Sequence, residues 1–311
     1  HPHLPGLPQR TDNHDRQSVA TSTYRGRFAP SPSGPLHLGS LSTALASFLD
    51  ARAARGLWLL RIEDIDPPRE QQGASERILS SLRAHALNWD GDVVHQSRRH
   101  AAYEDAVAWL LANDHAFHCT CSRKDLHAGD GHHAASCPRS RLPPPGPAAI
   151  RLRATGTRYR FEDRILGNIT LPEPAGGDDF VIKRRDGLYA YQLAVVVDDA
   201  WQGITHVVRG RDLLDSTPHQ IHLHELLGGP VPRFAHAPLL LNADDEKLSK
   251  QNHAPALDDT LPARNLLQCL RALGQPPPPA DLEHDCDAIL RWAIARWHCV
   301  SVPDTDWHTT A

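Results

Sequence analysis

The chain has 311 residues, a formal net charge of −4 and 40% hydrophobic residues, which excludes a disordered polypeptide and a generally basic nucleic-acid coat. No apolar run approaches the roughly 18–20 residues of a membrane helix, no secretory leader opens the sequence, and six cysteines are too few for a disulfide scaffold. The length favours about two domains. The cysteine usage predicts a protein of the reducing cytoplasm, and the lack of a long apolar run predicts no membrane segment.

The first part of the chain predicts a flexible leader followed by an α/β unit. Residues 1–22 mix Pro, His, Asp, Arg and Ser without apolar periodicity, which is typical of a flexible segment. The pattern after them predicts a strand over 24–28, a Pro/Gly-rich loop over 29–35, a helix from Leu38 that ends at Gly56, and a strand over 57–62. Strand, loop, helix and strand within about 40 residues form a βαβ unit, and hence an α/β domain.

The rest of the chain predicts an insertion, a second α/β half and a helical end. Helical periodicity covers 74–87 and 100–111, a Cys/His/Gly/Pro-rich stretch covers 119–147, and short strands and turns cover 151–182. Further strands are predicted over 193–197, 204–208 and 239–241, with helices near 215–227, 262–273 and 281–297. We therefore divide the chain after its leader into a first half over 23–112, an insertion over 113–187, a second half over 188–257 and a helical region over 258–311.

A first candidate site lies where the first strand gives way to the first helix, over residues 27–40. A phosphate at a helix start meets unpaired backbone N–H groups and the positive end of the helix dipole. His37 can donate to phosphate oxygens, and Gly39 lets a flat ring lie against the backbone. An ordinary Pro/Gly turn with a surface histidine explains these features about equally well.

A second candidate site is the lysine loop over residues 247–251. Lys247 and Lys250 are three positions apart, and two ammonium groups on a loop suit the neutralisation of a triphosphate. Taken alone, such a loop is more often simply solvated. It follows the last predicted strand of the second half, however, and the crevice at the carboxyl ends of the strands would bring it to the same ligand as the first site.

A third candidate site is a metal centre in the insertion. Its stretch over 119–147 contains three cysteines and three histidines, Cys119, Cys121, Cys137, His127, His132 and His133. Three thiolates and one imidazole would complete a tetrahedral Zn²⁺ shell of the closed, structural kind. Free thiols beside a histidine-rich loop are the alternative, but a metal is the more plausible source of order in a stretch so poor in apolar residues.

These motifs carry a family resemblance. His37-Leu38-Gly39-Ser40 and Lys247-Leu248-Ser249-Lys250-Gln251 resemble the two signatures of class I aminoacyl-tRNA synthetases. The flanks over 27–34, 61–66 and 208–213 look like glutamyl-tRNA synthetase, and those over 67–70, 89–92 and 247–257 look most like the glutamyl-Q tRNA(Asp) synthetase family. The resemblance implies a Rossmann-type class I synthetase catalytic domain with a zinc-containing insertion and a small helical C-terminal region.

The resemblance also implies roles for single residues. It implies glutamate contacts at Arg27, Phe28, Ala29, Pro30, Ser31, Glu63, Tyr191 and Arg209. It implies ATP contacts at His37, Gly39 and Lys250, catalytic roles for His37, Lys247 and Lys250, and zinc ligands at Cys119, Cys121, His133 and Cys137. His133 stands where the family frequently has tyrosine, and His127 or His132 could replace it. Mg²⁺ is expected with ATP.

The chemistry of glutamate agrees with the predicted strand ends. Arg27 and Arg209 could clamp a carboxylate there, and Glu63 could hold the ammonium. Asp198 and Asp199 are interpreted as strand-end residues without a role.

The function implied by the resemblance is activation of L-glutamate with ATP in the absence of tRNA. Glutamate is then transferred to the cyclopentene diol of queuosine at the wobble position of tRNA(Asp). Only 61 residues follow Lys250 in the 311-residue chain, too few for the expected anticodon-reading domain of an ordinary synthetase. A truncated glutamyl-tRNA synthetase that charges an acceptor end, and a tRNA-binding paralogue without chemistry, remain open. We expect a monomer.

Overall fold

The computed structural model describes residues 23–174, 177–249 and 254–309; the predicted leader lies outside them. Strand β1 (Arg25–Phe28) pairs in parallel with β2 (Leu57–Ile62), which pairs in parallel with β3 (Val94–His95). Helix α1 (Leu38–Ala53) connects β1 to β2, and leucines 41, 45 and 49 on its inner face are fully buried. Two further helices, α2 (Ala74–Ala84) and α3 (His100–Ala112), lie near their predicted positions. The βαβ unit predicted from the sequence is therefore confirmed.

The second half forms a separate four-stranded sheet, whose strand β9 (His206–Gly210) lies beside β1. Strand β9 pairs in parallel with β10 (Arg233–Ala237), and α6 (Thr217–Leu226) connects them after a 3₁₀ turn, η3 (Arg211–Ser216). The backbone N–H of Thr205 donates to the carbonyl of Arg25 at 2.9 Å, which joins this half to β1. The chain thus proceeds outward in both directions from β1 and β9, and such a switch point is where α/β folds bind ligands.

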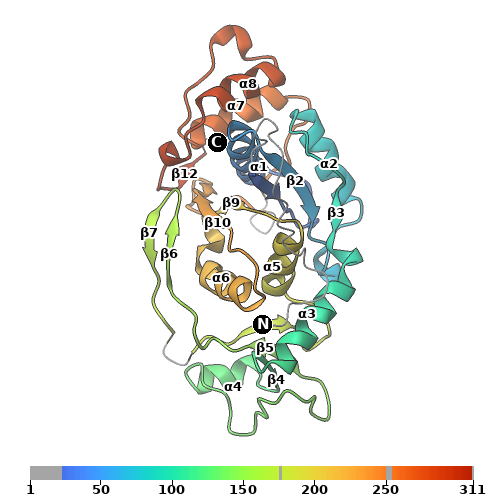
Figure 1. The fold of residues 1–311 in the computed structure, drawn as a ribbon. Coiled ribbons are helices and arrows are strands. Elements are labelled where there is room, and N and C mark those ends of the chain that lie inside the picture. Colours follow the sequence, from blue (N-terminus) through green and yellow to red (C-terminus); the bar gives the residue numbers. More distant parts are fainter. Residues whose placement is uncertain (1–22, 175–176, 250–253, 310–311) are drawn as a thin grey trace, which may run out of the picture.

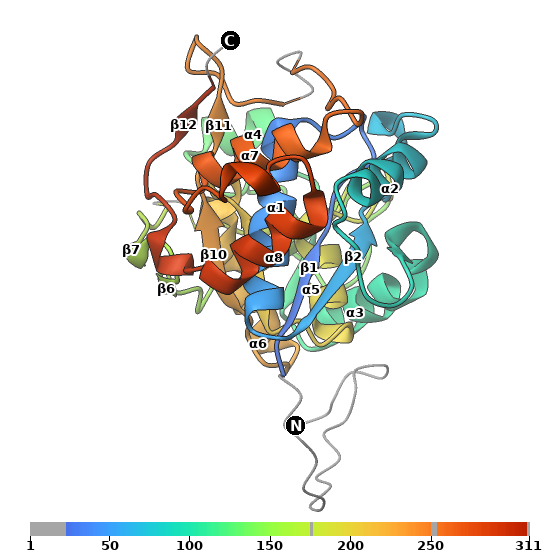
Figure 2. The same cartoon turned by 90° about the horizontal axis from the view of Figure 1, so that it is seen from above.

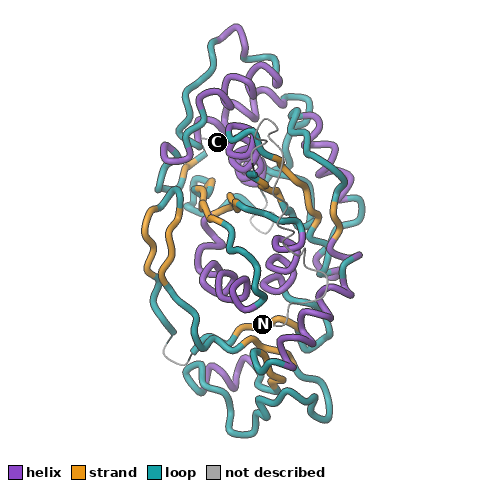
Figure 3. The backbone as a smooth tube through the Cα atoms, viewed as in Figure 1, coloured by secondary structure: helices purple, strands orange, loops and turns teal. Residues whose placement is uncertain are grey.

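A small antiparallel sheet and a hairpin form the inserted part. The sheet consists of β4 (Ala116–Cys119), β5 (Ala149–Leu152) and β8 (Phe180–Lys183), with a short helix, α4 (Arg123–Ala128), beside it. Strands β6 (Arg160–Asp163) and β7 (Gly167–Thr170) form the hairpin, and β6 also pairs with β10, which gives the four-stranded sheet the order β7-β6-β10-β9. Figure 1 shows the insertion at one end of the molecule and the C-terminal helices at the other, and Figure 3 shows that loop predominates in the insertion.

The C-terminal helices complete the core around α1. Helices α7 (Pro262–Ala272) and α8 (Cys286–Arg296) pack on α1, with Leu270 and Ile289 buried against it (Figure 2). Strand β12 (Trp307–His308) then pairs in parallel with β11 (Leu240–Leu241). In the part of the chain that the structure describes, no helix combines the length and the apolar character that crossing a membrane requires.

One predicted strand is wrong, and four described strands, β3, β4, β10 and β12, lie where the sequence pattern predicts no element. Residues 193–197 were predicted to be a strand but lie inside helix α5 (Tyr191–Trp201). Every side chain from 193 to 199 is buried in this helix, and a short apolar run that is buried on all sides carries no periodicity that separates helix from strand.

Candidate active site and metal centre

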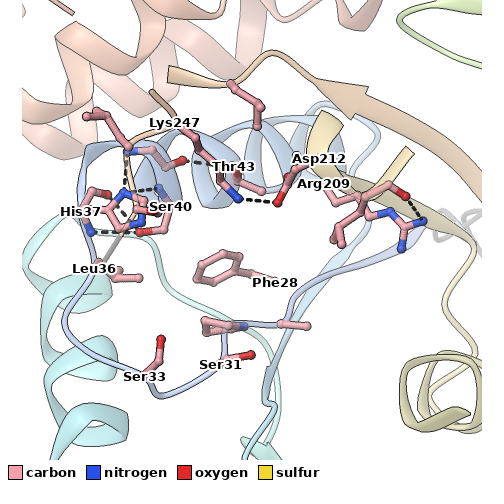
Figure 4. A pocket seen from close by; sticks show the side chains of 18 of the residues that line it. Phe28, Ser31, Ser33, Leu36, His37, Ser40, Thr43, Arg209, Asp212 and Lys247 are labelled. Carbon is pink, nitrogen blue, oxygen red and sulfur yellow. Dashed lines mark hydrogen bonds and ion pairs between the residues drawn. The ribbon is translucent and has the colours of Figure 1, made fainter. Parts of the chain in front are cut away.

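A cavity of about 530 Å³ opens where β1, β9 and the start of α1 meet. Its walls come from segments that are far apart in the sequence, over 27–40, 208–213, 238–240 and 247–249, together with Glu63, Ile78 and Tyr191. All of the predicted glutamate, ATP and catalytic residues that the structure describes line this one cavity. Lys250 lies outside the described residues. Figure 4 shows His37, Lys247, Asp212 and Arg209 arranged around Phe28.

His37 is the N-cap of α1, and its environment determines which ring nitrogen carries the proton. Its Nδ1 accepts hydrogen bonds from the backbone N–H groups of Gly39 at 3.1 Å and Ser40 at 3.3 Å. Burial, with a smaller contribution from Lys247, lowers the pKa of His37 to about 4. The imidazole is therefore neutral near pH 7, its proton is on Nε2, and it can donate to an anionic ligand in the cavity.

The two signature loops touch at Gly39. A Cβ atom at this position would lie 3.0 Å from Cε1 of His37 and 3.3 Å from the backbone oxygen of Leu248. The lysine loop is further anchored by an ion pair between Lys247 and Asp212, which follows β9. The absence of a side chain at Gly39 therefore allows both loops to face one ligand.

Arg209 is a buried cation held by neutral groups. Its guanidinium donates to Gln220 Oε1 at 2.6 Å, Thr217 Oγ1 at 2.8 Å, His236 Nε2 at 3.1 Å and the Tyr191 hydroxyl at 3.4 Å. No carboxylate of a described residue lies within 4 Å of it. Burial lowers the pKa of Arg209. A carboxylate ligand in the cavity would supply the missing negative charge.

His236 fixes the orientation of the Arg209 guanidinium. Its Nδ1 lies 2.5 Å from Oδ2 of the fully buried Asp163, while its Nε2 accepts from Arg209. An imidazole that accepts at Nε2 must carry its proton on Nδ1, so Asp163 selects the tautomer that can hold the arginine.

Arg27 is arranged differently from Arg209, because it already has a carboxylate partner. Its Nε and Nη2 each lie 3.0 Å from the carboxylate oxygens of Asp199, which also accepts from Arg61 at 2.7 Å. Burial opposes ionisation, but Arg27 and Arg61 hold the pKa of Asp199 below its ordinary range. The structure corrects the interpretation of Asp199 and its neighbour Asp198, because both lie in α5 rather than at a strand end.

Glu63 follows β2 and is the carboxylate of this wall that is least neutralised. Its Oε2 accepts from Gln96 Nε2 at 2.8 Å, and Arg61 Nε lies 3.8 Å away. Burial raises the pKa of Glu63 to about 7, although Arg61 and Arg27 act in the opposite direction. A ligand ammonium would be attracted to Glu63 only when this carboxyl group is ionised.

Several residues that organise the cavity are not predicted by the sequence pattern: Asp199, Gln96, Asp212, Gln220 and His236. Their partners lie at very different separations in the chain: Gln220 is 11 positions from Arg209, and Asp199 is 172 positions from Arg27. An arginine and an aspartate at that separation give no local signal. Tyr191, Asp198 and Asp199 have a helical spacing, which could have indicated that the aspartates lie on a helix with Tyr191. The prediction of a strand over 193–197 is incompatible with that spacing.

A cluster of cysteine and histidine side chains lies in the insertion. The donor atoms of Cys119, Cys121, His133 and Cys137 all lie within 4.8 Å of one another. The other ring nitrogen of His133 lies 3.1 Å from Oδ2 of Asp179. A carboxylate behind a histidine is the usual support for a metal-ligating imidazole. These four residues could therefore hold a metal ion, and the structure brings His133 rather than His127 or His132 to the cysteines.

Comparisons with known proteins agree with this geometry. The family model described as tRNA synthetases class I (E and Q), catalytic domain, matches residues 23–144 and 138–265. A glutamyl-Q tRNA(Asp) synthetase of Yersinia pestis is 49% identical over 295 residues, which cover 95% of this chain and 91% of the relative. A protein of the same name from Pseudomonas aeruginosa is 50% identical over 283 residues, which cover 91% of this chain and 96% of the relative.

A solved structure supports the same grouping. The crystal structure of a glutamate tRNA ligase from Elizabethkingia meningosepticum, in complex with its amino acid, is 26% identical to this chain with a TM-score of 0.76. The match covers 93% of this chain and 67% of that one. From the family model, the extent of the identity and the arrangement of the two signature loops around one cavity, we conclude that the chain belongs to the glutamyl-Q tRNA(Asp) synthetase family of class I aminoacyl-tRNA synthetases.

Proposed function

We propose that this protein activates L-glutamate with ATP without the help of tRNA, and transfers the glutamate to the cyclopentene diol of queuosine at the wobble position of tRNA(Asp). The observation that supports this most directly is Arg209, a buried cation without a carboxylate partner among the described residues, in the same cavity as the poorly neutralised Glu63. A carboxylate on Arg209 and an ammonium near Glu63 are the two ends of an amino acid with an acidic side chain. The names of the relatives agree with glutamate.

The first step is the formation of glutamyl-adenylate. An oxygen of the α-carboxylate attacks the α-phosphorus of ATP, and the bond to the bridging oxygen breaks, so that pyrophosphate leaves. Negative charge grows on the phosphate oxygens, and the Nε2–H of His37, the N-terminus of α1 and Lys247 are available to stabilise it. We assign Lys250 to the same task from its motif. Mg²⁺ bound with ATP would screen the leaving phosphates.

The second step is transfer to the nucleoside. A hydroxyl oxygen of queuosine attacks the carbonyl carbon of the adenylate, AMP leaves, and the hydroxyl proton passes to the leaving phosphate or to solvent. The cis-diol of queuosine resembles that of a terminal ribose, so a pocket suited to one can accept the other. Glutamate, ATP and tRNA meet in the cytoplasm, so we propose a cytoplasmic enzyme, and we propose that it acts as a monomer.

Zinc is the metal that we propose for the insertion. A tetrahedral ion with Zn–S near 2.3 Å and Zn–N near 2.0–2.1 Å holds sulfur and nitrogen about 3.6 Å apart. The Nδ1 atom of His133 lies 3.5, 3.6 and 3.9 Å from the sulfur atoms of Cys119, Cys121 and Cys137. All four protein ligands are present, so the ion would hold the insertion together and leave no open position for catalysis.

The experiment that tests the proposed function asks where glutamate is attached. Queuosine-containing tRNA(Asp) without its terminal adenosine is incubated with radiolabelled glutamate, ATP and the enzyme, and is then cleaved with a nuclease. We expect the label on the anticodon fragment, and none on a matched tRNA(Asp) that carries guanosine at the wobble position. Label that requires an intact acceptor end would instead establish the alternative, a truncated glutamyl-tRNA synthetase.

A further inference from the structure

A second cavity, of about 800 Å³, adjoins the first. The two share Ser31, Ser33, Glu63 and Tyr191 in their walls. The other residues that line the second cavity are Pro32, Ile65, Asp66, Arg69, Glu70, Gln96, Arg184, Tyr189 and Ala190. Neither His37 nor the described part of the lysine loop reaches it. A group bound there would therefore lie next to the amino acid and away from the signature loops that face ATP.

Gln96 presents a fixed acceptor without a partner in this wall. Its side chain is completely buried, and its Nε2 donates to Glu63 Oε2 at 2.8 Å and to Asp198 Oδ2 at 3.0 Å. Two carboxylates at the amide nitrogen prevent the amide from turning over, because its oxygen would then face both of them. Oε1 accepts no hydrogen bond from any residue that the structure describes. A buried acceptor in this state can take a donor from a ligand that enters the cavity.

Glu70 presents a second such acceptor, and this one carries a charge. Its Oε1 is buried and has no hydrogen-bond partner among the described residues. Burial raises the pKa of Glu70, and the carboxylates of Asp64 and Asp66 raise it further, whereas the backbone N–H of Asp66 lowers it. No described cation lies within ion-pair distance of Glu70. A cationic group brought into the cavity would relieve both the repulsion and the lost solvation.

The two arginines of the cavity are occupied elsewhere. Arg69 and Arg184 each lie 3.4 Å from a carboxylate oxygen of Asp66, and their side chains are 79% and 40% exposed. They neutralise Asp66, and Glu70 is left without a cationic partner among the described residues. Ile65, Tyr189 and Ala190 add apolar surface to the same wall. The cavity therefore suits a partly apolar ring that carries hydroxyl donors and one positive charge.

We propose that the second cavity binds the side chain of queuosine, with Glu70 contacting the positively charged secondary amine between the cyclopentene ring and the base, and Gln96 Oε1 accepting from a hydroxyl of the diol. This inference rests on the proposed function and adds a specificity-determining residue to it. A terminal ribose offers a cis-diol but no adjacent cation. Glu70 would therefore favour queuosine over an acceptor end, whereas Gln96 serves either diol.

The test compares Glu70→Gln with Glu76→Gln. Glu76 lies on α2 and lines neither of the two cavities, so its substitution is the matched control. Two rates are measured for each protein: glutamate-dependent ATP–pyrophosphate exchange without tRNA, and glutamate transfer to queuosine-containing tRNA(Asp). We expect Glu70→Gln to lower kcat/KM for transfer at least about tenfold, the loss typical of a hydrogen bond to a charged group, and to leave exchange within about twofold. Glu76→Gln should leave both unchanged. Equal losses in exchange and transfer, or an unchanged transfer rate, would overturn the role of Glu70.

A binding measurement separates this inference from the proposed function. Free queuine base and an amine-free cyclopentene cis-diol are titrated calorimetrically into the glutamate-loaded wild-type protein and into Glu70→Gln. We expect the substitution to weaken queuine binding at least about tenfold and to leave the weaker binding of the amine-free diol unchanged. Equal weakening of both probes would show that Glu70 does not contact the amine. The enzyme could bind queuine through Glu70 and yet label only acceptor ends. That result would support the proposed contact with Glu70 and refute the proposed transfer to queuosine.

Discussion

At the scale of single residues, the cavity is distinguished by how its charges are balanced. Asp199 balances Arg27 and Arg61 together, whereas Arg209 is surrounded by neutral acceptors and Glu63 has an arginine nitrogen no closer than 3.8 Å. Leaving a buried charge partly unbalanced costs stability, and such sites are concentrated where a ligand completes the balance. Substitution of Arg209 or Glu63 should therefore weaken glutamate binding.

Glu63 should make glutamate binding depend on pH. Its pKa is raised to about 7 by burial, so the free enzyme loses the negative charge as the pH falls below 7, and the substrate ammonium loses its partner. The KM for glutamate in ATP–pyrophosphate exchange should therefore be constant above about pH 7. Below that pH it should increase by a factor that approaches ten for each unit by which the pH is lowered. Glu63→Gln should show a high KM without this slope. An equal slope in wild type and variant would assign the titration to another group.

Arg209→Lys should raise the KM for glutamate at least about tenfold with little change in the KM for ATP. Lysine keeps the charge but cannot reproduce the planar fork that His236, Gln220 and Thr217 orient. Arg158→Lys, at an exposed ion pair with Glu225, is the matched control and should behave as wild type. A normal glutamate KM in folded Arg209→Lys would remove this residue from the glutamate site.

At the scale of elements, the active site depends on contacts between loops and the ends of helices and strands. His37 caps α1, and the lysine loop lies against it at Gly39. The C-terminal strand also supports this region, because β12 pairs with β11, where the Leu240 carbonyl accepts from the backbone N–H of Leu248 at 2.8 Å. Asp306 also accepts from the backbone N–H of Leu239 at 2.9 Å. The geometry of the two signatures therefore relies on three separate parts of the chain.

Gly39→Ala should lower glutamyl-adenylate formation at least about tenfold without a comparable loss of stability. The added methyl group would meet the His37 ring at 3.0 Å and the Leu248 carbonyl at 3.3 Å, so it displaces groups that face the phosphates. Gly229→Ala is the control, because its nearest neighbour would lie 3.9 Å away. Exchange kinetics and thermal unfolding of both variants check this. Equal activity of the two variants would contradict the close approach of the loops.

Cys137→Ser should release the metal and loosen the insertion. We expect about one zinc ion per wild-type chain by elemental analysis, and a large loss in the variant together with new protease cleavage between residues 119 and 147. Cys286→Ser, outside the cluster in α8, should retain the ion. Wild-type protein that contains no metal and still resists protease in this stretch would rule out the zinc site.

At the scale of the whole molecule, the C-terminal helices belong to the same core as the catalytic half. Leu266, Leu270 and Ile289 form one buried cluster with the side chains of β1, β2 and α1. The insertion side has a separate cluster, built around α3, α5 and the small antiparallel sheet. The position of α1, and with it of His37, is therefore determined from both ends of the chain.

Leu270→Ala should destabilise the catalytic half as well as the C-terminal helices. The side chain is 1% exposed, and truncating a buried leucine lowers the free energy of unfolding by about 2–5 kcal/mol. Circular dichroism and tryptophan fluorescence should show one shifted transition in denaturant. An early transition confined to the C-terminal helices, with an unchanged main transition, would show that they form an independent unit.

The sequence alone determined the α/β architecture, the two signature loops and the cysteine pattern of the insertion. These are local: His37 and Gly39 lie at a helix start, and the zinc-site cysteines lie within one short stretch, so spacing and residue chemistry are sufficient to identify them. The strand bounds of β2 were predicted to the residue, because flanking turns limit a short apolar run on both sides.

Only the tertiary structure decided that residues 193–197 are helical and how the buried charges are shared. A fully buried run is apolar on every face, so its period is absent from the sequence, and its packing between neighbouring elements determines its conformation. Asp199 meets Arg27 and Arg61 across 172 and 138 positions. Whether an arginine is neutralised, as Arg27 is, or left for a ligand, as Arg209 is, depends on such distant partners. The energy of two charges depends on the distance between them, and residues that are more than 100 positions apart in the sequence come close only in the folded chain.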